Sequence, residues 1–159
     1  MVDPLDSLDY AILSELRKDS KMPHKELASI LDVHPNTLVQ RLEKLRKNGV
    51  LLRYSAEIDY TKAGYDLHVI IMIRVKKGRA GDNDQIRDLV NLSEVESLYA
   101  TTGSWDLIAV CRVKDRAHLL EVISEFGKNP IVLKTSSQLV LHTYKNPSDF
   151  NPFKSPAKK

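Results

Sequence analysis

Five polar side chains in the first third of the chain have the chemistry of a surface that reads nucleic acid. Asn36 and Gln40 can each form two hydrogen bonds with adenine, and Thr37 can offer a base edge its hydroxyl or its methyl group. Lys44 and Lys47 can reach phosphates. If this stretch is helical, its turn of about 100° per residue gathers these side chains on one side, with Thr37 at the margin. The pattern therefore predicts a base-reading helix.

Three helical patterns in residues 1–50 provide the elements that position this surface. Asp6 can cap the first helix, and Pro23 and Pro35 suit the first turns of the second and third. Gly49 suits a left-handed stop. The apolar residues recur at helical spacing in each pattern: Leu8, Ile12 and Leu16; Leu27, Ile30 and Leu31; Leu38, Leu42 and Leu45. Two helices joined by a tight turn after another element describe a helix-turn-helix, whose second helix enters the DNA major groove.

The charge distribution favours the same interpretation. The whole chain has a formal net charge of +3, whereas residues 33–53 contain five basic residues and one acid, a local charge of +4. Such local concentration is the footprint expected of a nucleic-acid-binding face. The alternative is a solvated polar face on an ordinary helical bundle. The complete set of candidate DNA contacts is His34, Pro35, Asn36, Thr37, Gln40, Arg41, Lys44 and Lys47.

The second half of the chain changes to the period of two that is typical of strands. The expected elements are a strand over 67–75, a helix over 82–91, strands over 95–102 and 105–113, a helix capped by Asp115, and a strand over 131–144. This order matches the ferredoxin-like βαββαβ unit, so we expect an α+β fold. The predicted organisation is a helix-turn-helix DNA-binding domain over 1–50, a linking strand over 51–66, a ferredoxin-like effector and oligomerisation domain over 67–145, and a flexible or draped tail over 146–159.

The expected sheet has an apolar face that its two helices leave bare. Its candidate residues lie at alternate strand positions: Ile70, Met72, Leu98, Ile108 and Val110. A solvent-facing sheet normally carries polar residues at such positions, so we expect two copies to stack these faces in a twofold dimer. The alternative is that the tail or the DNA-binding half covers this face within one chain. A dimer would place two recognition helices about 34–36 Å apart, one turn of DNA.

The turn Thr101–Asp106, with sequence TTGSWD, could bind a zwitterionic amino acid. Gly103 permits positive φ, and exposed amides beside it can bind a carboxylate. Asp106 can accept hydrogen bonds from an ammonium group. The alternative is a hairpin turn in which Asp106 bonds only backbone amides.

Three segments together resemble the Lrp/AsnC (feast/famine) transcription regulators: LDSLDYAIL at 5–13, LVQRLEKLRKNGV at 38–50, and TTGSWD at 101–106. The resemblance covers about residues 5–145. It implies an N-terminal helix-turn-helix, a C-terminal ligand-responsive βαββαβ domain, and dimers that assemble into tetramers, octamers or larger rings on double-stranded DNA. It also implies small effectors, usually amino acids, bound where ligand-responsive domains of neighbouring dimers meet.

The resemblance also extends the candidate effector site to the middle of the last strand. With Tyr99 and Trp105 as apolar walls, the candidate effector contacts are Tyr99, Thr101, Thr102, Gly103, Ser104, Trp105, Asp106, Thr135, Ser137 and Gln138. The chain departs from the family at Asp32-Val33-His34, where Gly-Leu-Ser is common. His34 therefore replaces the usual capping serine, and Pro35 can compensate in part by fixing the first turn.

Enzymatic chemistry has few candidate residues. Cys111 is the only cysteine, which rules out an intrachain disulfide and a multi-cysteine zinc site. The five histidines show no zinc-ligand spacing, and no phosphate-binding glycine loop is present. We therefore expect no catalytic residues, metal or cofactor, no membrane span, and a cytoplasmic location. The enzyme alternative is a sirohaem-decarboxylase-like protein, which shares this architecture and would need a tetrapyrrole-sized cavity and suitably placed histidines.

Overall fold

The chain forms two compact units, and the first is built from both ends of the sequence. One unit comprises residues 1–57 with 144–159, and the other comprises residues 58–143. The computed structural model describes residues 4–76 and 84–153. Within these residues, no helix is long and apolar enough to cross a membrane.

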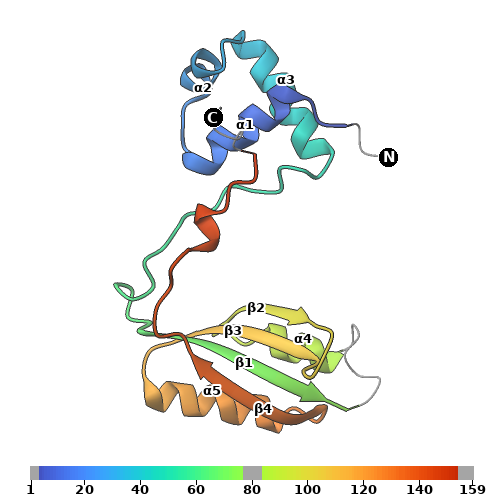
Figure 1. The fold of residues 1–159 in the computed structure, drawn as a ribbon, viewed down its shortest axis with the longest axis vertical. Coiled ribbons are helices and arrows are strands. Elements are labelled where there is room, and N and C mark those ends of the chain that lie inside the picture. Colours follow the sequence, from blue (N-terminus) through green and yellow to red (C-terminus); the bar gives the residue numbers. More distant parts are fainter. Residues whose placement is uncertain (1–3, 77–83, 154–159) are drawn as a thin grey trace. The chain divides into compact units, whose positions relative to one another are not determined.

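The first unit contains the three expected helices, α1 (Ser7–Lys18), α2 (His24–Ile30) and α3 (Pro35–Lys47) (Figure 1). A capping box begins α1: the Asp9 backbone N–H donates to Asp6, and the Asp6 N–H donates back to the Asp9 carboxylate. The buried core consists of the apolar stripes of the helices: Ile12, Leu13, Leu16, Leu27, Ala28, Leu38, Leu42 and Leu45. The helix-turn-helix prediction is confirmed.

The ends of α3 follow from local chemistry. Asp32, in the turn before it, adopts a φ of +52°, a left-handed conformation that aspartate tolerates better than most residues. At the other end Gly49 has a φ of +68°, as predicted. The Gly49 N–H donates to Arg46 O and the Val50 N–H to Leu45 O, which is the Schellman arrangement.

The second unit is an antiparallel sheet in the order β2-β3-β1-β4 with helices on one face. Its elements are β1 (Leu67–Val75), α4 (Asp84–Val90), β2 (Val95–Ala100), β3 (Leu107–Val113), α5 (Arg116–Lys128) and β4 (Val132–Leu139) (Figure 1). Alternate residues of β1 and β3 are fully buried and share one core with Leu89 of α4 and Phe126 of α5. The predicted βαββαβ order is therefore confirmed. We call the other side of the sheet the open face.

Several predicted boundaries differ from the observed ones. Residues 51–66 form no strand, and 60–64 within them form a turn, so the linking strand expected there is not present in this chain. Nothing in the described part of the chain supplies the second strand with which that segment could pair. The last strand ends at Leu139, five residues earlier than expected. Two residues of the helix expected over 82–91, 82 and 83, lie outside the described residues. Residues 154–159 of the expected tail also lie outside them.

Candidate functional site

The predicted DNA-reading side chains lie on one helix of the first unit. The side of α3 opposite its buried leucines carries exposed Asn36, Gln40 and Lys47, and half-buried Thr37 and Lys44 lie beside them. This distribution is the one that helical spacing predicts, and it leaves the amide groups able to approach an external partner. One acid, Glu43, is also exposed on this helix.

Arg41 has partners inside the protein. Its guanidinium forms an ion pair with Asp9 Oδ1 at 3.2 Å and a second with Asp6. The Asp9 side chain is only 1% exposed, so Arg41 supplies a positive charge to an otherwise buried carboxylate. The hydrogen bond from the Asp9 N–H, followed by that from Arg41, holds the pKa of Asp6 below its ordinary value. Arg41 thus joins α3 to the capped start of α1, a role that the sequence analysis missed.

His34 takes over the capping function of the missing serine. Its Nδ1 accepts a hydrogen bond from the Asn36 backbone N–H at 3.2 Å, and Pro35 occupies the first helical position. An imidazole nitrogen accepts a hydrogen bond only when it carries no hydrogen, so the ring hydrogen of His34 must lie on Nε2 in this arrangement. The departure from the family pattern therefore changes the capping group and leaves the start of α3 hydrogen-bonded.

The TTGSWD turn is fastened to the end of β1 in the second unit. Gly103 has a φ of +105°, as its type predicts. The Asp106 N–H donates to Ile73 O at 3.0 Å, and the Thr101 hydroxyl donates to Trp105 O at 2.8 Å. Arg74 donates to Ser104 O. The turn is therefore held in one conformation by groups of its own strand pair and of β1.

Asp106 has a structural partner in this conformation. Its Oδ2 accepts the Val75 backbone N–H at 2.9 Å and lies 3.7 Å from Arg74 Nε. This geometry supports the alternative in which Asp106 bonds a backbone amide. Two cations beside the turn were missed: Arg74, and Lys134, whose Nζ lies 5.8 Å from the centre of the Trp105 ring. Only the strand register, which pairs Arg74 with Lys134, brings them to this place.

The three candidate effector residues of β4 do not share one surface. Thr135 and Ser137 are paired with Ile73 and Ile71, whose side chains are buried under the helices, whereas Gln138 is paired with half-buried Ile70. Because successive strand residues point to opposite faces, Gln138 lies on the open face and its two companions do not. Within one chain, Gln138 and its two companions therefore lie on opposite faces of the sheet, and their shared effector role stays a prediction.

The open face retains four of its five predicted apolar residues. Ile70 pairs with Val110 and Met72 with Ile108 on that face, and all four are half-buried in a single chain. Leu98 is a correction, because it pairs with buried Ala109 and packs against the core. An irregularity in β2 between Val95 and Ser97 shifts the alternation by one residue. Tyr99, which pairs with Ile108 and is 55% exposed, takes the place of Leu98 on the open face.

Comparison with known proteins identifies both units. Residues 5–46 match the AsnC-type helix-turn-helix domain model, and residues 68–150 match the Lrp/AsnC ligand binding domain model. The chain belongs to the Lrp/AsnC family of transcriptional regulators. The two matched models are a DNA-binding helix-turn-helix and a ligand-binding domain, the combination that the resemblance of the three sequence segments implies.

Relatives of this Lrp/AsnC chain align over nearly their whole length. The HTH-type transcriptional regulator FL11 of Pyrococcus horikoshii is 31% identical over 92% of this chain and 95% of its own. Regulatory protein AsnC of Haemophilus influenzae is 32% identical over 90% and 93%. Among solved structures, E. coli AsnC has a TM-score of 0.81 with 26% identity, covering 90% of this chain and 96% of its own. A feast or famine regulatory protein of M. tuberculosis complexed with L-methionine has a TM-score of 0.84 with 25% identity, covering 94% and 100%.

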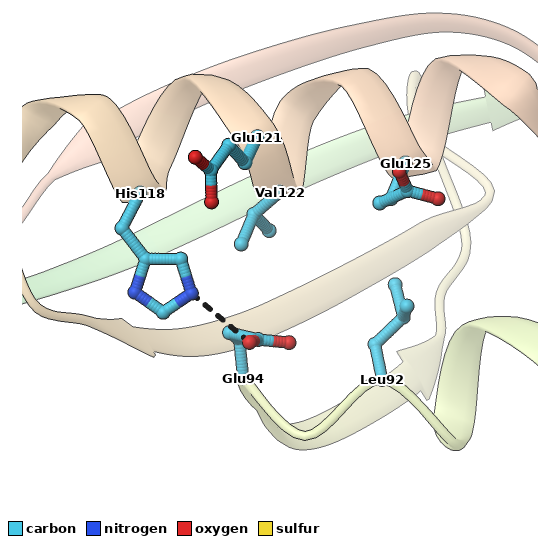
Figure 2. Close-up of a pocket in the computed structure, with 6 residues that line it drawn as sticks. All are labelled: Leu92, Glu94, His118, Glu121, Val122 and Glu125. Atoms are coloured by element: carbon cyan, nitrogen blue, oxygen red, sulfur yellow. Dashed lines mark hydrogen bonds and ion pairs between the residues drawn. The ribbon is translucent and has the colours of Figure 1, made fainter.

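The ligand-binding domain of this Lrp/AsnC protein also has a pocket on its helix side, lined by none of the residues of the TTGSWD turn. Figure 2 shows its lining: Leu92, Glu94, His118, Glu121, Val122 and Glu125. His118 Nδ1 accepts the Lys114 N–H at 3.2 Å, and its Nε2 therefore donates to Glu94 at 3.0 Å. Burial opposes ionisation of Glu94, but this hydrogen bond and its neighbours hold the pKa of Glu94 below its ordinary value.

This pocket does not resemble a cofactor cavity. Its volume of about 270 Å³ is below the roughly 300–1,000 Å³ of small-molecule cavities. Its histidine already has partners on both ring nitrogens. The pocket therefore gives no support to the sirohaem-decarboxylase alternative, and the named relatives are transcriptional regulators.

Proposed function

We propose that the protein is a cytoplasmic, sequence-specific regulator that reads double-stranded DNA with α3. Exposed Asn36 and Gln40, with Thr37 beside them, would contact base edges, and Lys44 and Lys47 would contact phosphates. The observation that carries this proposal is the polar side of α3, which faces away from the buried leucines of the helix-turn-helix. His34 and Pro35 would contribute through the hydrogen-bonded start of the helix, and Arg41 through its ion pairs with α1.

The DNA-reading role is tested by separating base contacts from phosphate contacts. The probe is the best-bound duplex that the parent chain selects from a random library. Gln40→Ala should relax selectivity at particular positions, with a cost of about 1–3 kcal/mol on the selected duplex. Lys47→Ala should weaken all duplexes alike and reduce the slope of log affinity against log salt by about one. If neither variant changes affinity for the selected duplex, α3 is not the reading helix.

We also propose an amino acid as effector, bound at the TTGSWD turn. The turn offers Gly103 in a positive-φ conformation, two nearby cations and the aromatic ring of Trp105. The carboxylate of the ligand would be held by turn amides and these cations, while Gln138, on the open face, would meet the ligand where neighbouring copies come together. The M. tuberculosis relative complexed with L-methionine supports an amino acid as the ligand class.

Trp105 reports on this site directly because it is the only tryptophan in the chain. Titration with each common amino acid should give a saturable fluorescence change with one of them. Gln138→Leu should change which amino acid binds, whereas Ser137→Ala, one residue away on the opposite face, should leave selectivity as it was. If no amino acid changes the Trp105 fluorescence, or if Gln138→Leu leaves the selectivity among amino acids unchanged, the effector site lies elsewhere.

The open face is proposed as the dimer interface. Ile70, Met72, Ile108 and Val110 are only half-buried in one chain and would be covered by the same face of a second copy. Tyr99 joins this surface in place of Leu98. Dimers would then assemble into tetramers or octamers. Sedimentation at micromolar concentration tests this assembly: Met72→Lys should dissociate it, and a parent chain that sediments as a stable monomer would refute it.

A further inference from the structure

The chain's last described residues, 146–153, form a strap that lies on α1 (Figure 1). We call this segment the C-terminal strap. It begins with a short 3₁₀ helix, η1 (Pro147–Asp149), whose first turn is closed by a hydrogen bond from the Asn146 N–H to the Asp149 carboxylate at 2.9 Å. A flexible or draped tail is expected over 146–159 from its sequence, and as far as Phe153 the tail is draped on α1.

One arginine of α1 holds the backbone of the strap. The Arg17 guanidinium donates through Nη2 to Pro147 O at 3.0 Å and to Phe150 O at 2.8 Å, and it also donates to Ser148 O. Its Nε donates to Phe150 O at 3.1 Å. A guanidinium has five donors in a fixed plane and no acceptor, so it matches a cluster of carbonyl oxygens at the end of a short helix.

The rest of the contact follows the same side of α1. Asn151 Nδ2 donates to Ser14 O at 3.1 Å and lies 3.3 Å from Ser14 Oγ. Phe153 packs against the helix-turn-helix core, and its ring centre lies 6.0 Å from that of Tyr10. Tyr10, Ser14 and Arg17 are spaced four and then three residues apart, so they form one face of the helix. Along this single helical face, the strap therefore contacts a charged donor at Arg17, a polar residue at Ser14 and an aromatic ring at Tyr10.

The strap is also bonded to the segment that leads out of the recognition helix. Ser148 Oγ donates to Glu57 Oε1 at 2.6 Å. Earlier in that segment Leu51 packs against the helical core, and the Tyr54 ring lies 5.3 Å from the Arg46 guanidinium carbon of α3. Both covalent connections to the ligand-binding unit are therefore held on the DNA-binding unit by side-chain contacts.

We propose that the outer face of α1 is a docking site for the chain's own C-terminal strap, and that the docked strap couples the ligand-binding domain to DNA binding. The chain leaves the ligand-binding unit at residue 143, three residues before the strap begins. A conformational change in the ligand-binding unit would therefore be transmitted to α1 through this short connection. The proposal rests on DNA binding by the helix-turn-helix, whose failure would appear as loss of binding by the parent chain.

The test uses variants of the full chain and the selected duplex. Arg17→Gln removes the charge that holds the strap carbonyls, and Phe153→Ala removes the aromatic anchor. Lys18→Gln is the matched control, because it removes the same charge from the neighbouring position, where Lys18 pairs with Glu15. Limited digestion with chymotrypsin reports release of the strap through cleavage after Phe150.

We expect Arg17→Gln and Phe153→Ala to speed cleavage after Phe150 and to lower DNA affinity about tenfold, a magnitude typical of coupling between sites. Lys18→Gln should change neither by more than about twofold. A chain ending at Lys145 should bind DNA as weakly as Phe153→Ala, and adding Arg17→Gln to it should cost nothing further. Unchanged cleavage would overturn the docking, and faster cleavage with parental DNA affinity would overturn the coupling.

Discussion

Replacing Arg41 with methionine distinguishes a structural arginine from a DNA-contacting one. Methionine keeps most of the apolar stem and removes the guanidinium, which pairs with Asp9 at 3.2 Å and with Asp6. The Asp9 carboxylate is buried, and it keeps the hydrogen bond from the Asp6 N–H at 3.2 Å. The substitution therefore removes the charged partner of a buried carboxylate.

The expected cost follows from the burial of Asp9. Removing one member of a fully buried ion pair costs about 3–5 kcal/mol, whereas an exposed pair contributes about 0–1 kcal/mol. Asp9 is 1% exposed but the Arg41 side chain is 30% exposed, so solvent screens the pair in part. We expect a loss of about 2 kcal/mol, with no share assigned to the exposed Asp6 contact. For a domain of this size the loss corresponds to roughly 8–16 °C in melting temperature.

Thermal unfolding followed by far-ultraviolet circular dichroism measures this loss, with DNA affinity determined at a temperature where every variant is folded. Lys47→Met is the matched control, because it removes one positive charge from an exposed position of the same helix. It should lower DNA affinity and leave the melting temperature nearly unchanged. The reasoning is refuted if Arg41→Met melts with the parent and loses DNA affinity as Lys47→Met does.

Three further predictions concern single groups. Asp32→Gly should raise the free energy of unfolding by about 0.5 kcal/mol and so raise the urea midpoint slightly, because relief of the left-handed conformation outweighs the greater freedom of glycine in the unfolded chain. A lower midpoint would contradict this balance. The lowered pKa of Asp6 means that its ionised form stabilises the fold above the unfolded pKa, near 4, and that this stabilisation disappears as pH falls through the folded pKa. Acid titration of Asp6→Asn should accordingly lose stability less steeply than that of the parent. Burial raises the pKa of Cys111 to about 12, so an aromatic disulfide reagent at pH 8 should modify it only after unfolding, and rapid labelling of the native protein would count against a buried thiol.

Local patterns were sufficient to predict the helices and the order of the sheet. The apolar stripe of α3, its proline start and its Gly49 stop all depend on residues within a few positions of one another. The alternation in β1 likewise identifies its buried face, because one side of the sheet is covered by helices throughout. Sequence patterns are therefore reliable predictors of burial where one packed layer, such as the helices over this sheet, covers the same face of the element along its whole length.

Features that depend on register or on a distant partner were not predictable in this way. The irregularity between Val95 and Ser97 turns Leu98 toward the core and Tyr99 toward the open face. The residue types at these positions do not predict this shift in register. The segment over 51–58 has a strand-like alternation, but the structure gives it no pairing partner within the chain. A periodic pattern indicates which residues could share a face and does not supply the second strand.

The candidate sites show the same limit. Asp106 is hydrogen-bonded to Val75, 31 positions away, and Arg41 is ion-paired with Asp9, 32 positions away. Each side chain has the right chemistry for an external ligand, and each has an internal partner that becomes visible only in three dimensions. Helical spacing alone was sufficient to predict that Gln40 lies on the side of α3 opposite its buried leucines, where the structure shows it exposed.

The origin of the DNA-binding unit from both ends of the sequence bears on how the protein is made. A ribosome releases the three helices before the strap, with the whole ligand-binding unit in between. Until Asn151 and Phe153 emerge, the Tyr10–Arg17 face of α1 has no occupant from its own chain. A nascent chain that has not yet reached Phe153 therefore carries an incomplete helix-turn-helix unit, so full assembly of this unit waits until the strap has been synthesised.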